Sequence, residues 1–167
     1  MPESVDTRFA LYPGSFDPFT YGHLDILERA LRLFERIEVT VAVNTGKEAG
    51  LFAPEERCEL IRRCTHHMDG VSTTTFEGLL VDHARDQGAG VLLRGLRQVK
   101  DFDYEFRMAF ANRKLHPDLE TVFLMTSEQN AFVSSTIVRD VHRWGGDLSK
   151  FVPTPVAEAL EAKREQS

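Results

Sequence analysis

The amino-acid sequence predicts an α/β fold in which helices cover both faces of one parallel sheet. Three observations lead to this prediction. Short β-branched or apolar runs alternate with segments of helical apolar spacing, glycine and proline stand between most of them, and 167 residues suffice for one domain with its own core. Strands that are separated by helices pair in parallel through right-handed crossovers.

The first half of the chain contains three strand and helix pairs. Apolar or β-branched runs predict strands at Arg8–Tyr12, Arg36–Val43 and Val71–Phe76. Helical spacing of apolar residues predicts helices at Gly22–Phe34, from Pro54 onward and at Gly78–Gln87. Pro54 fits a first helical turn, where its missing N–H is not needed, and Gly88 fits the C-terminal cap of the third helix.

The second half continues the alternation. Strands are predicted at Val91–Arg94, which is nearly all apolar, and at Thr121–Met125. Helices are predicted from a cap at Asp101 to about Leu115, from a cap at Ser134 or Ser135 to Trp144, and from about residue 154 into a polar tail that ends at residue 167. We therefore expect a single Rossmann-like, doubly wound α/β domain over residues 1–167 with a five-stranded parallel sheet. Ligands of such sheets bind beyond the carboxyl ends of the strands, so the loops after the first, second, fourth and fifth strands should surround one crevice.

Composition limits the possible partners. The formal net charge is −6, which argues against a broad nucleic-acid-binding surface. No apolar stretch approaches the roughly 18 residues that span a bilayer, and no secretory leader is evident, so no membrane partner is expected. Cys58 and Cys64 would lie on different faces of a helix, which suits neither a disulfide nor a metal site. We expect a cytoplasmic protein.

The loop after the first strand is the strongest functional signal. Residues 12–23 read Tyr-Pro-Gly-Ser-Phe-Asp-Pro-Phe-Thr-Tyr-Gly-His, and a helical pattern begins where they end. A helix N-terminus offers unpaired N–H groups and the positive end of its dipole, which together favour phosphate. Thr20 is the expected N-cap, which places His23 in the first turn as an additional donor. The alternative is that His23 is an exposed residue at the start of a helix.

Three basic residues follow the fourth strand. Arg94, Arg97 and Lys100 lie within seven residues, and Arg94 stands at the end of a buried strand. A buried guanidinium is costly unless it meets an anion, which favours a phosphate ligand. Surface salt bridging is the alternative for the two arginines.

These segments resemble a known family. Ser15-Phe16-Asp17-Pro18 with Thr20-Tyr21-Gly22-His23 is similar to the signature loop of the nucleotidylyltransferase superfamily. Leu93–Arg97 followed by Asp101–Glu105, and then Phe132–Arg139, resemble segments of the bacterial phosphopantetheine adenylyltransferases. The resemblance spans essentially the whole chain, including its length and the order of its elements.

The resemblance implies a reaction. ATP and 4′-phosphopantetheine would give dephospho-coenzyme A and pyrophosphate, with Mg²⁺ arriving on the ATP phosphates and few or no protein ligands to it. It also implies a homohexamer and coenzyme A as a feedback ligand. Two alternatives stay open: a nucleotidylyltransferase that acts on nicotinamide mononucleotide or glycerol phosphate, and a non-catalytic sensor of adenine nucleotides.

The resemblance also implies roles for residues of this chain. His23 would donate to the α-phosphate, Lys47 would hold the incoming phosphate, and Arg94 would clamp the phosphate of phosphopantetheine. Further substrate contacts would come from Ser15, where a threonine is more usual, and from Leu79 and Leu80. The ATP contacts would be Ser15, Phe16, His23, Gly95, Leu96, Arg97, Glu105, Asn130, Ala131, Phe132, Val133, Ser134, Ser135 and Thr136.

Some of these residues have ordinary structural alternatives. Lys47 fits a solvated loop, and Leu79 and Leu80 fit a hydrophobic core. Glu105 on its predicted helix could pair with Arg107 or Lys100, and the hydroxyls of residues 134–136 suit a helix cap, which is compatible with anion binding.

Overall fold

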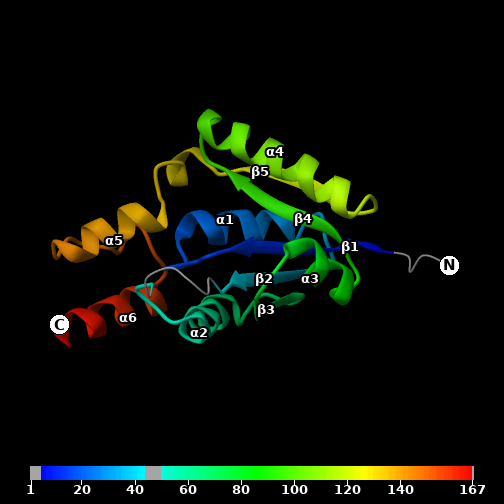
Figure 1. Cartoon of the computed structure of the whole chain (residues 1–167). Coiled ribbons are helices and arrows are strands. Elements are labelled where there is room, and N and C mark those ends of the chain that lie inside the picture. Colours follow the sequence, from blue (N-terminus) through cyan, green and yellow to red (C-terminus); the bar gives the residue numbers. More distant parts are fainter. Residues whose placement is uncertain (1–4, 44–49, 167) are drawn as a thin grey trace.

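Five parallel strands form one sheet in the order β3-β2-β1-β4-β5 (Figure 1). The computed structural model describes residues 5–43 and 50–166. The strands are β1 (Asp6–Gly14), β2 (Arg36–Ala42), β3 (Val71–Phe76), β4 (Ala89–Leu96) and β5 (Glu120–Met125). The predicted α/β fold with a five-stranded parallel sheet is confirmed.

Helices follow the strands in the predicted sequence. The described part of the chain holds α1 (Tyr21–Ala30), α2 (Pro54–Thr65), α3 (Leu80–Gln87), α4 (Val99–Leu115), α5 (Ser135–Arg143) and α6 (Thr154–Glu165), with a 3-10 turn at Glu128–Asn130. Gly88 caps α3 at a φ of 70°, in the left-handed region that favours glycine, so its predicted capping role is confirmed.

Three helix boundaries differ from the prediction by two residues or more. α3 begins at Leu80 instead of Gly78. α1 ends at Ala30 instead of Phe34, because the N–H groups of Leu33 and Phe34 both turn back to the carbonyl of Ala30. Leu31 and Phe34 still pack on the core, which explains why the apolar spacing continues past the helix. α4 begins at Val99, two residues before the expected cap. The Asp101 carboxylate accepts the N–H of Gln98 from within the first turn, so the capping carboxylate lies inside the helix.

Successive residues of β1 face opposite sides of the sheet. Ala10 and Tyr12 belong to the larger core cluster, with α1 and α2, whereas Phe9 and Leu11 belong to a second cluster with α3. α4 lies on the α3 side, where Phe102 packs near Phe123 of β5. Helices therefore cover both faces, as a doubly wound fold requires.

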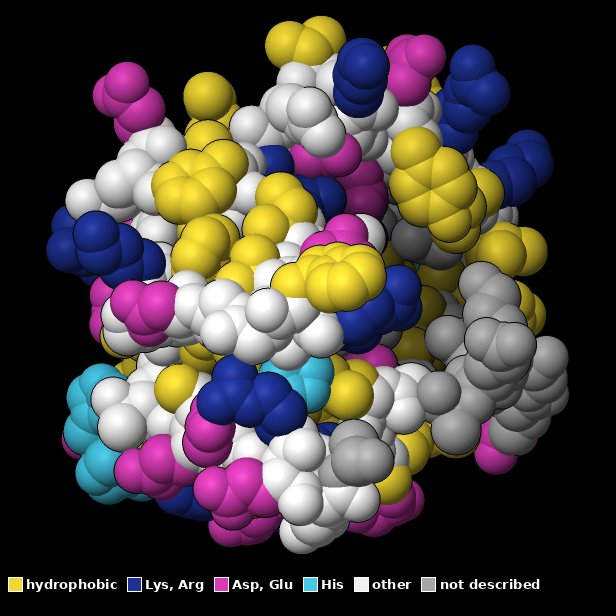
Figure 2. Space-filling model, turned by 90° about the vertical axis from the view of Figure 1, so that its left-hand side faces the viewer, with side chains coloured by type: hydrophobic (Ala, Val, Ile, Leu, Met, Phe, Trp, Pro, Cys, Tyr) yellow, Lys and Arg dark blue, Asp and Glu magenta, His cyan; other side chains and the backbone are white. Residues whose placement is uncertain are grey.

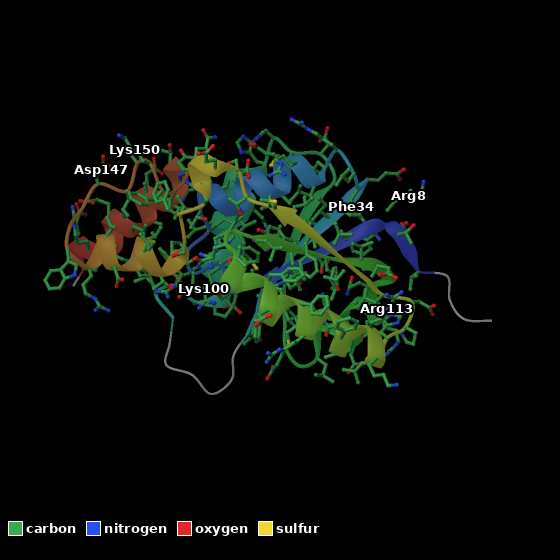
Figure 3. The ribbon with its side chains drawn as sticks, turned by 90° about the horizontal axis from the view of Figure 1, so that it is seen from above. Arg8, Phe34, Lys100, Arg113, Asp147 and Lys150 are labelled. Atoms are coloured by element: carbon green, nitrogen blue, oxygen red, sulfur yellow. The ribbon has the colours of Figure 1, made fainter. Side chains whose placement is uncertain are left out.

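The carboxyl ends of the strands point towards α5 and α6, which lie beyond that end of the sheet (Figure 1). Figure 3 shows the same polarity in α4: Lys100 at its start lies towards α5, and Arg113 lies near the opposite end of the molecule, on the side of Arg8. Val138 and Val156 carry the larger core cluster into α5 and α6. Acidic and basic side chains are interspersed on the face that carries these two helices (Figure 2).

Within the described residues, none of the helices has both the length and the apolar character needed to cross a membrane.

Candidate active site

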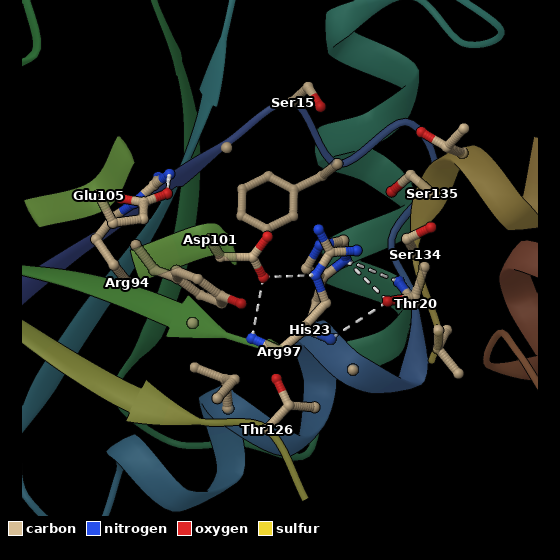
Figure 4. A pocket seen from close by; sticks show the side chains of 18 of the residues that line it. Ser15, Thr20, His23, Arg94, Arg97, Asp101, Glu105, Thr126, Ser134 and Ser135 are labelled. Carbon is tan, nitrogen blue, oxygen red and sulfur yellow. Dashed lines mark hydrogen bonds and ion pairs between the residues drawn. The ribbon is translucent and has the colours of Figure 1, made fainter. Parts of the chain in front are cut away.

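A cavity of about 530 Å³ lies at the carboxyl end of the sheet, where β1, β4 and β5 give way to their loops (Figure 4). Its wall combines the loop between β1 and α1, the first turn of α1, the end of β4, the start of α4 and the start of α5. The lining residues are Tyr12, Pro13, Gly14, Ser15, Phe16, Thr20, Gly22, His23, Ile26, Arg94, Gly95, Arg97, Lys100, Asp101, Tyr104, Glu105, Thr126, Val133, Ser134, Ser135, Thr136 and Arg139. The loops after β1, β4 and β5 thus meet at one crevice, as predicted, whereas the loop after β2, which was also expected there, lies largely outside the described residues.

The start of α1 fixes the orientation of His23. Thr20 is the N-cap, and its hydroxyl accepts the N–H of His23 at 3.3 Å. In return the backbone N–H of Thr20 donates to Nδ1 of His23 at 3.0 Å. This reciprocal arrangement is a capping box in which histidine takes the place of the usual glutamate. Because Nδ1 accepts a hydrogen bond, the proton of the neutral ring lies on Nε2.

The surroundings of His23 keep the imidazole neutral. Its ring stacks on Phe19 at 5.5 Å and meets the edge of Phe16 at 4.9 Å between centroids. Burial, together with the positive charges of Arg97 and Arg94, lowers the pKa of His23 to about 3. His23 therefore presents a neutral N–H donor to the cavity over the physiological pH range.

Arg94 and Glu105 form a two-point ion pair inside the cavity. The Nε of Arg94 donates to one carboxylate oxygen of Glu105 at 2.8 Å and Nη2 to the other at 2.5 Å, while Nη1 donates to the carbonyl of Pro13 at 2.8 Å. Burial lowers the pKa of Arg94, but the hydrogen bond and charge of Glu105 outweigh it and raise that pKa overall. The sequence predicts an anion beside Arg94, and in this structure that anion is the Glu105 carboxylate. Glu105 therefore pairs with Arg94, and not with Arg107 or Lys100.

Arg97 is held more loosely. Its Nε lies 3.6 Å from the carboxylate of Asp101, which also accepts the backbone N–H groups of Arg97 and Gln98. Lys100 makes no ion pair with any residue that the structure describes, so it adds an uncompensated positive charge to the cavity wall.

The start of α5 places hydroxyl groups beside the loop between β1 and α1. The Ser134 hydroxyl accepts the N–H of Ile137, which settles the predicted choice of cap in favour of Ser134. Ser135 donates from its hydroxyl to the carbonyl of Pro18 at 2.8 Å. Arg139 donates to the carbonyl of Asp17 at 2.5 Å and to the Thr136 hydroxyl at 3.3 Å. A helix N-terminus and a guanidinium therefore face the same volume as His23, a combination that favours polyphosphate.

Several residues of the predicted site do not line the cavity. Leu79 is 59% exposed, and Leu80 packs against the second core cluster. Of residues 130–133, Val133 alone lines the cavity, and Phe132 is exposed and packs edge-to-face on Phe151. The other predicted contacts outside the cavity wall are Leu96, Asn130 and Ala131. Lys47 lies outside the described residues.

Among the lining residues with polar side chains, four had no predicted role. Tyr12 is buried at the cavity floor, and burial raises its pKa, so it is a neutral hydroxyl there. It is the last residue of the predicted strand Arg8–Tyr12, and its place in a strand gave no sign of a ligand contact. Tyr104 and Arg139 belong to the segments that carried the family resemblance, which was the available signal for them. Thr126, just past β5, carried no signal beyond its place at a strand end.

The described acidic and histidine side chains of the cavity wall do not gather into a cluster of metal ligands. No cluster of three or more His, Cys, Asp or Glu side chains that could hold a metal ion occurs in the described parts of the chain. Asp101 and Glu105, the carboxylates of the cavity wall, are both paired with arginines.

The comparison with known proteins agrees with this geometry. A family model described as cytidylyltransferase-like matches residues 11–141. A solved structure described as a nicotinate-nucleotide adenylyltransferase of Vibrio parahaemolyticus superposes with a TM-score of 0.70, covering 95% of this chain and 93% of that one at 16% identity. At that identity the structural likeness concerns the fold alone. Because the family match runs from β1 through α5 and so includes every segment of the cavity wall, the chain belongs to the cytidylyltransferase-like family, whose chemistry is nucleotidyl transfer.

Proposed function

We propose that this chain transfers the adenylyl group of ATP to 4′-phosphopantetheine, with dephospho-coenzyme A and pyrophosphate as products. The observation that carries the proposal is the juxtaposition of a neutral N–H donor at His23 with the cations at Arg94 and Arg97 and the N-terminus of α5. A cavity of about 530 Å³ with these groups suits two phosphorylated ligands held end to end.

The reaction requires no protein nucleophile. An oxygen of the acceptor phosphate attacks the α-phosphorus of ATP, the bond from that phosphorus to the bridging oxygen breaks, and pyrophosphate departs with the bonding electron pair. The protein has to align the two anions and stabilise the charge on the α-phosphoryl oxygens. His23 donates its Nε2 proton in a hydrogen bond to one of those oxygens, without giving the proton up.

The remaining groups bind and orient. Arg97 and the hydroxyls of Ser134 and Thr136 face the β- and γ-phosphates of ATP. Arg94 takes the acceptor phosphate, which replaces the Glu105 carboxylate as its partner. In this proposal Lys47 assists at the incoming phosphate, and Mg²⁺ neutralises the polyphosphate when bound to it.

The choice of acceptor depends on the segment after β4. Arg94 and Arg97 with Tyr104 and Glu105 make the resemblance to phosphopantetheine adenylyltransferases specific, and all four line the cavity. The structural neighbour from Vibrio parahaemolyticus favours nicotinate mononucleotide as a second candidate acceptor.

One experiment separates the candidates. Purified protein is incubated with ATP and Mg²⁺ and, in parallel, with 4′-phosphopantetheine, nicotinate mononucleotide or glycerol phosphate. Pyrophosphate release is followed, and the products are identified by mass spectrometry. We expect dephospho-coenzyme A from the first reaction. Release with nicotinate mononucleotide alone would reassign the acceptor, and ATP binding without any release would indicate a sensor.

We also propose that the chain assembles as a homohexamer, that coenzyme A is a feedback ligand, and that the enzyme acts in the cytoplasm. The support for assembly is an apolar stripe on α4: Phe102, Phe106 and Phe110 are spaced at helical intervals and are 43–59% exposed. Light scattering after gel filtration gives the mass. A monomeric wild-type protein would contradict the assembly, and the Phe106→Ser variant should weaken it.

A further inference from the structure

A buried ion pair lies behind the loop between β1 and α1. Asp17 of that loop and Arg57 of α2 approach to 3.5 Å between Oδ1 and Nε, and the side chain of each is 9% exposed. Neither residue lines the cavity. Buried ion pairs add little net stability, because the desolvation of two charges offsets their attraction. The pair therefore calls for an explanation other than stability.

The pair joins the loop to the chain that leads into α2. The Asp17 carboxylate accepts the N–H of Leu51 at 2.8 Å and the N–H of Phe52 at 2.9 Å. Arg57 donates from Nε to the carbonyl of Phe52 at 2.7 Å and from Nη1 to the carbonyl of Ser15 at 3.2 Å. Three of these four hydrogen bonds hold the loop, at Ser15 and at Asp17, on either side of Phe16.

Phe16 is the residue whose backbone needs such support. Its φ is 47°, in the left-handed region that costs a non-glycine residue about 1–3 kcal/mol unless its surroundings enforce it. Its side chain is buried, and its ring makes a T-shaped contact with the His23 imidazole. A change in the backbone at Phe16 would therefore move the wall against which the imidazole packs.

The same turn presents donors to the cavity. Ser15 and Phe16 both line the cavity, and within the described residues neither backbone N–H has a hydrogen-bond acceptor. With the Ser15 carbonyl held by Arg57, the peptide plane between Ser15 and Phe16 is fixed, and so is the direction of the Phe16 N–H.

We propose that Asp17 and Arg57 are positioning residues. Without touching a ligand, they set the left-handed turn at Phe16, and through it the Phe16 N–H and the His23 ring, in the geometry that nucleotidyl transfer needs. This inference rests on the proposed function. Misplacing reacting groups by about 1 Å can lower the rate about 100-fold.

The chain offers a matched control. Glu38 of β2 and His83 of α3 form another buried pair at 2.9 Å, with side chains 11% and 15% exposed, and neither lines the cavity. A variant of that pair should affect stability in the way that any broken buried pair does, with no path to the Phe16 turn.

The test compares three variants with the wild type: Asp17→Asn, Arg57→Lys and Glu38→Gln. The two backbone N–H groups donate to different oxygens of Asp17, and asparagine would replace one of these oxygens with an NH2 donor. Lysine at 57 keeps the charge but loses the planar fork. Stability to urea, kcat and KM for ATP, and the Kd for ATP by calorimetry are measured below the unfolding transition of each variant.

We expect Asp17→Asn and Arg57→Lys to lower kcat about 10- to 100-fold and to weaken ATP binding about tenfold, while Glu38→Gln lowers stability only. Turnover within about twofold of the wild type in Arg57→Lys, or an equal loss in Glu38→Gln, would overturn the inference. If one of the two loop variants does not fold, the other decides.

The ATP titration keeps this inference separate from the proposed acceptor. If the wild type binds ATP but does not adenylylate phosphopantetheine, the proposed function fails, while the Kd comparison still decides the role of the pair. If the wild type binds no ATP, both proposals fail.

Discussion

His23 gives the sharpest prediction because the structure fixes its tautomer and its charge. In the His23→Ala variant the Nε2–H donor to the α-phosphoryl oxygens is lost. A single donor to charge that develops in the transition state contributes about 2.7–4 kcal/mol, so turnover should fall about 100- to 1000-fold. Affinity for ATP should change only a few-fold, because the cations of the cavity dominate ground-state binding and remain in place.

The pH dependence distinguishes a neutral donor from a cation. The pKa of His23 in the free protein is lowered to about 3, so the ring stays neutral from mildly acidic pH upward. The profile of kcat/KM reports groups of the free enzyme and should therefore show no inflection near pH 6.5 that depends on His23. A catalytic imidazolium would instead lose activity as the pH rose through that value.

The assay is pyrophosphate release under saturating ATP and acceptor, with His83→Ala as the matched histidine control. His83 bonds to Glu38 outside the cavity, and its loss should leave kcat close to that of the wild type. Near-normal turnover in His23→Ala, or an equal loss in His83→Ala, would refute the role of His23.

Three further outcomes follow from the same contacts. Below pH 6.5 the unfolded chain binds a proton at His23 that the folded chain refuses down to about pH 3, so the free energy of unfolding should fall as pH drops, by up to about 1.4 kcal/mol per pH unit. Urea titrations should show that His23→Gln lacks this part of the slope, and identical slopes would contradict the assigned pKa. Glu105→Gln removes the carboxylate that neutralises Arg94, so inorganic pyrophosphate should bind roughly fivefold more tightly. Calorimetry measures this affinity, and weaker binding would show that Glu105 mainly preorganises Arg94. In Gly50→Ala the new Cβ would collide with the Arg57 guanidinium and the Asp17 carboxylate. The free energy of unfolding should therefore fall by about 1–3 kcal/mol, and turnover should fall with it. Unchanged turnover would argue against the positioning role of the pair.

The fold was largely predictable because local signals agree with tertiary structure. The strand predicted from the β-branched run Arg36–Val43 and the cap at Gly88 need only local chemistry; the strand is found at Arg36–Ala42, and the cap is found as expected. The end of α1 was not predictable from apolar spacing, because Leu31 and Phe34 pack on the core in a turn as readily as in a helix. The spacing of apolar residues shows which side chains are buried, but it does not show whether their backbone is a helix or a turn.

The site was predictable as far as loops at strand ends determine it. His23, Arg94 and Arg97 share one cavity because the carboxyl ends of parallel strands share one edge. The partner of Glu105 was not predictable, since its contact with Arg94 joins a helix to a strand and has no spacing signature. Val133 lines the cavity and its neighbour Phe132 does not. The two residues are adjacent in an irregular segment, and sequence patterns do not show which of them faces the cavity.

Three carbonyl groups, at the end of β1 and in the loop that follows it, are held by side chains from three different elements. Arg94 holds Pro13, Arg57 holds Ser15, and Ser135 holds Pro18. A nascent chain on the ribosome thus carries the complete signature motif long before it carries a working nucleotide site, because the last of these supports is synthesised more than a hundred residues later. Fragments that end before α5 should accordingly be unable to retain nucleotide, however faithfully they keep the motif.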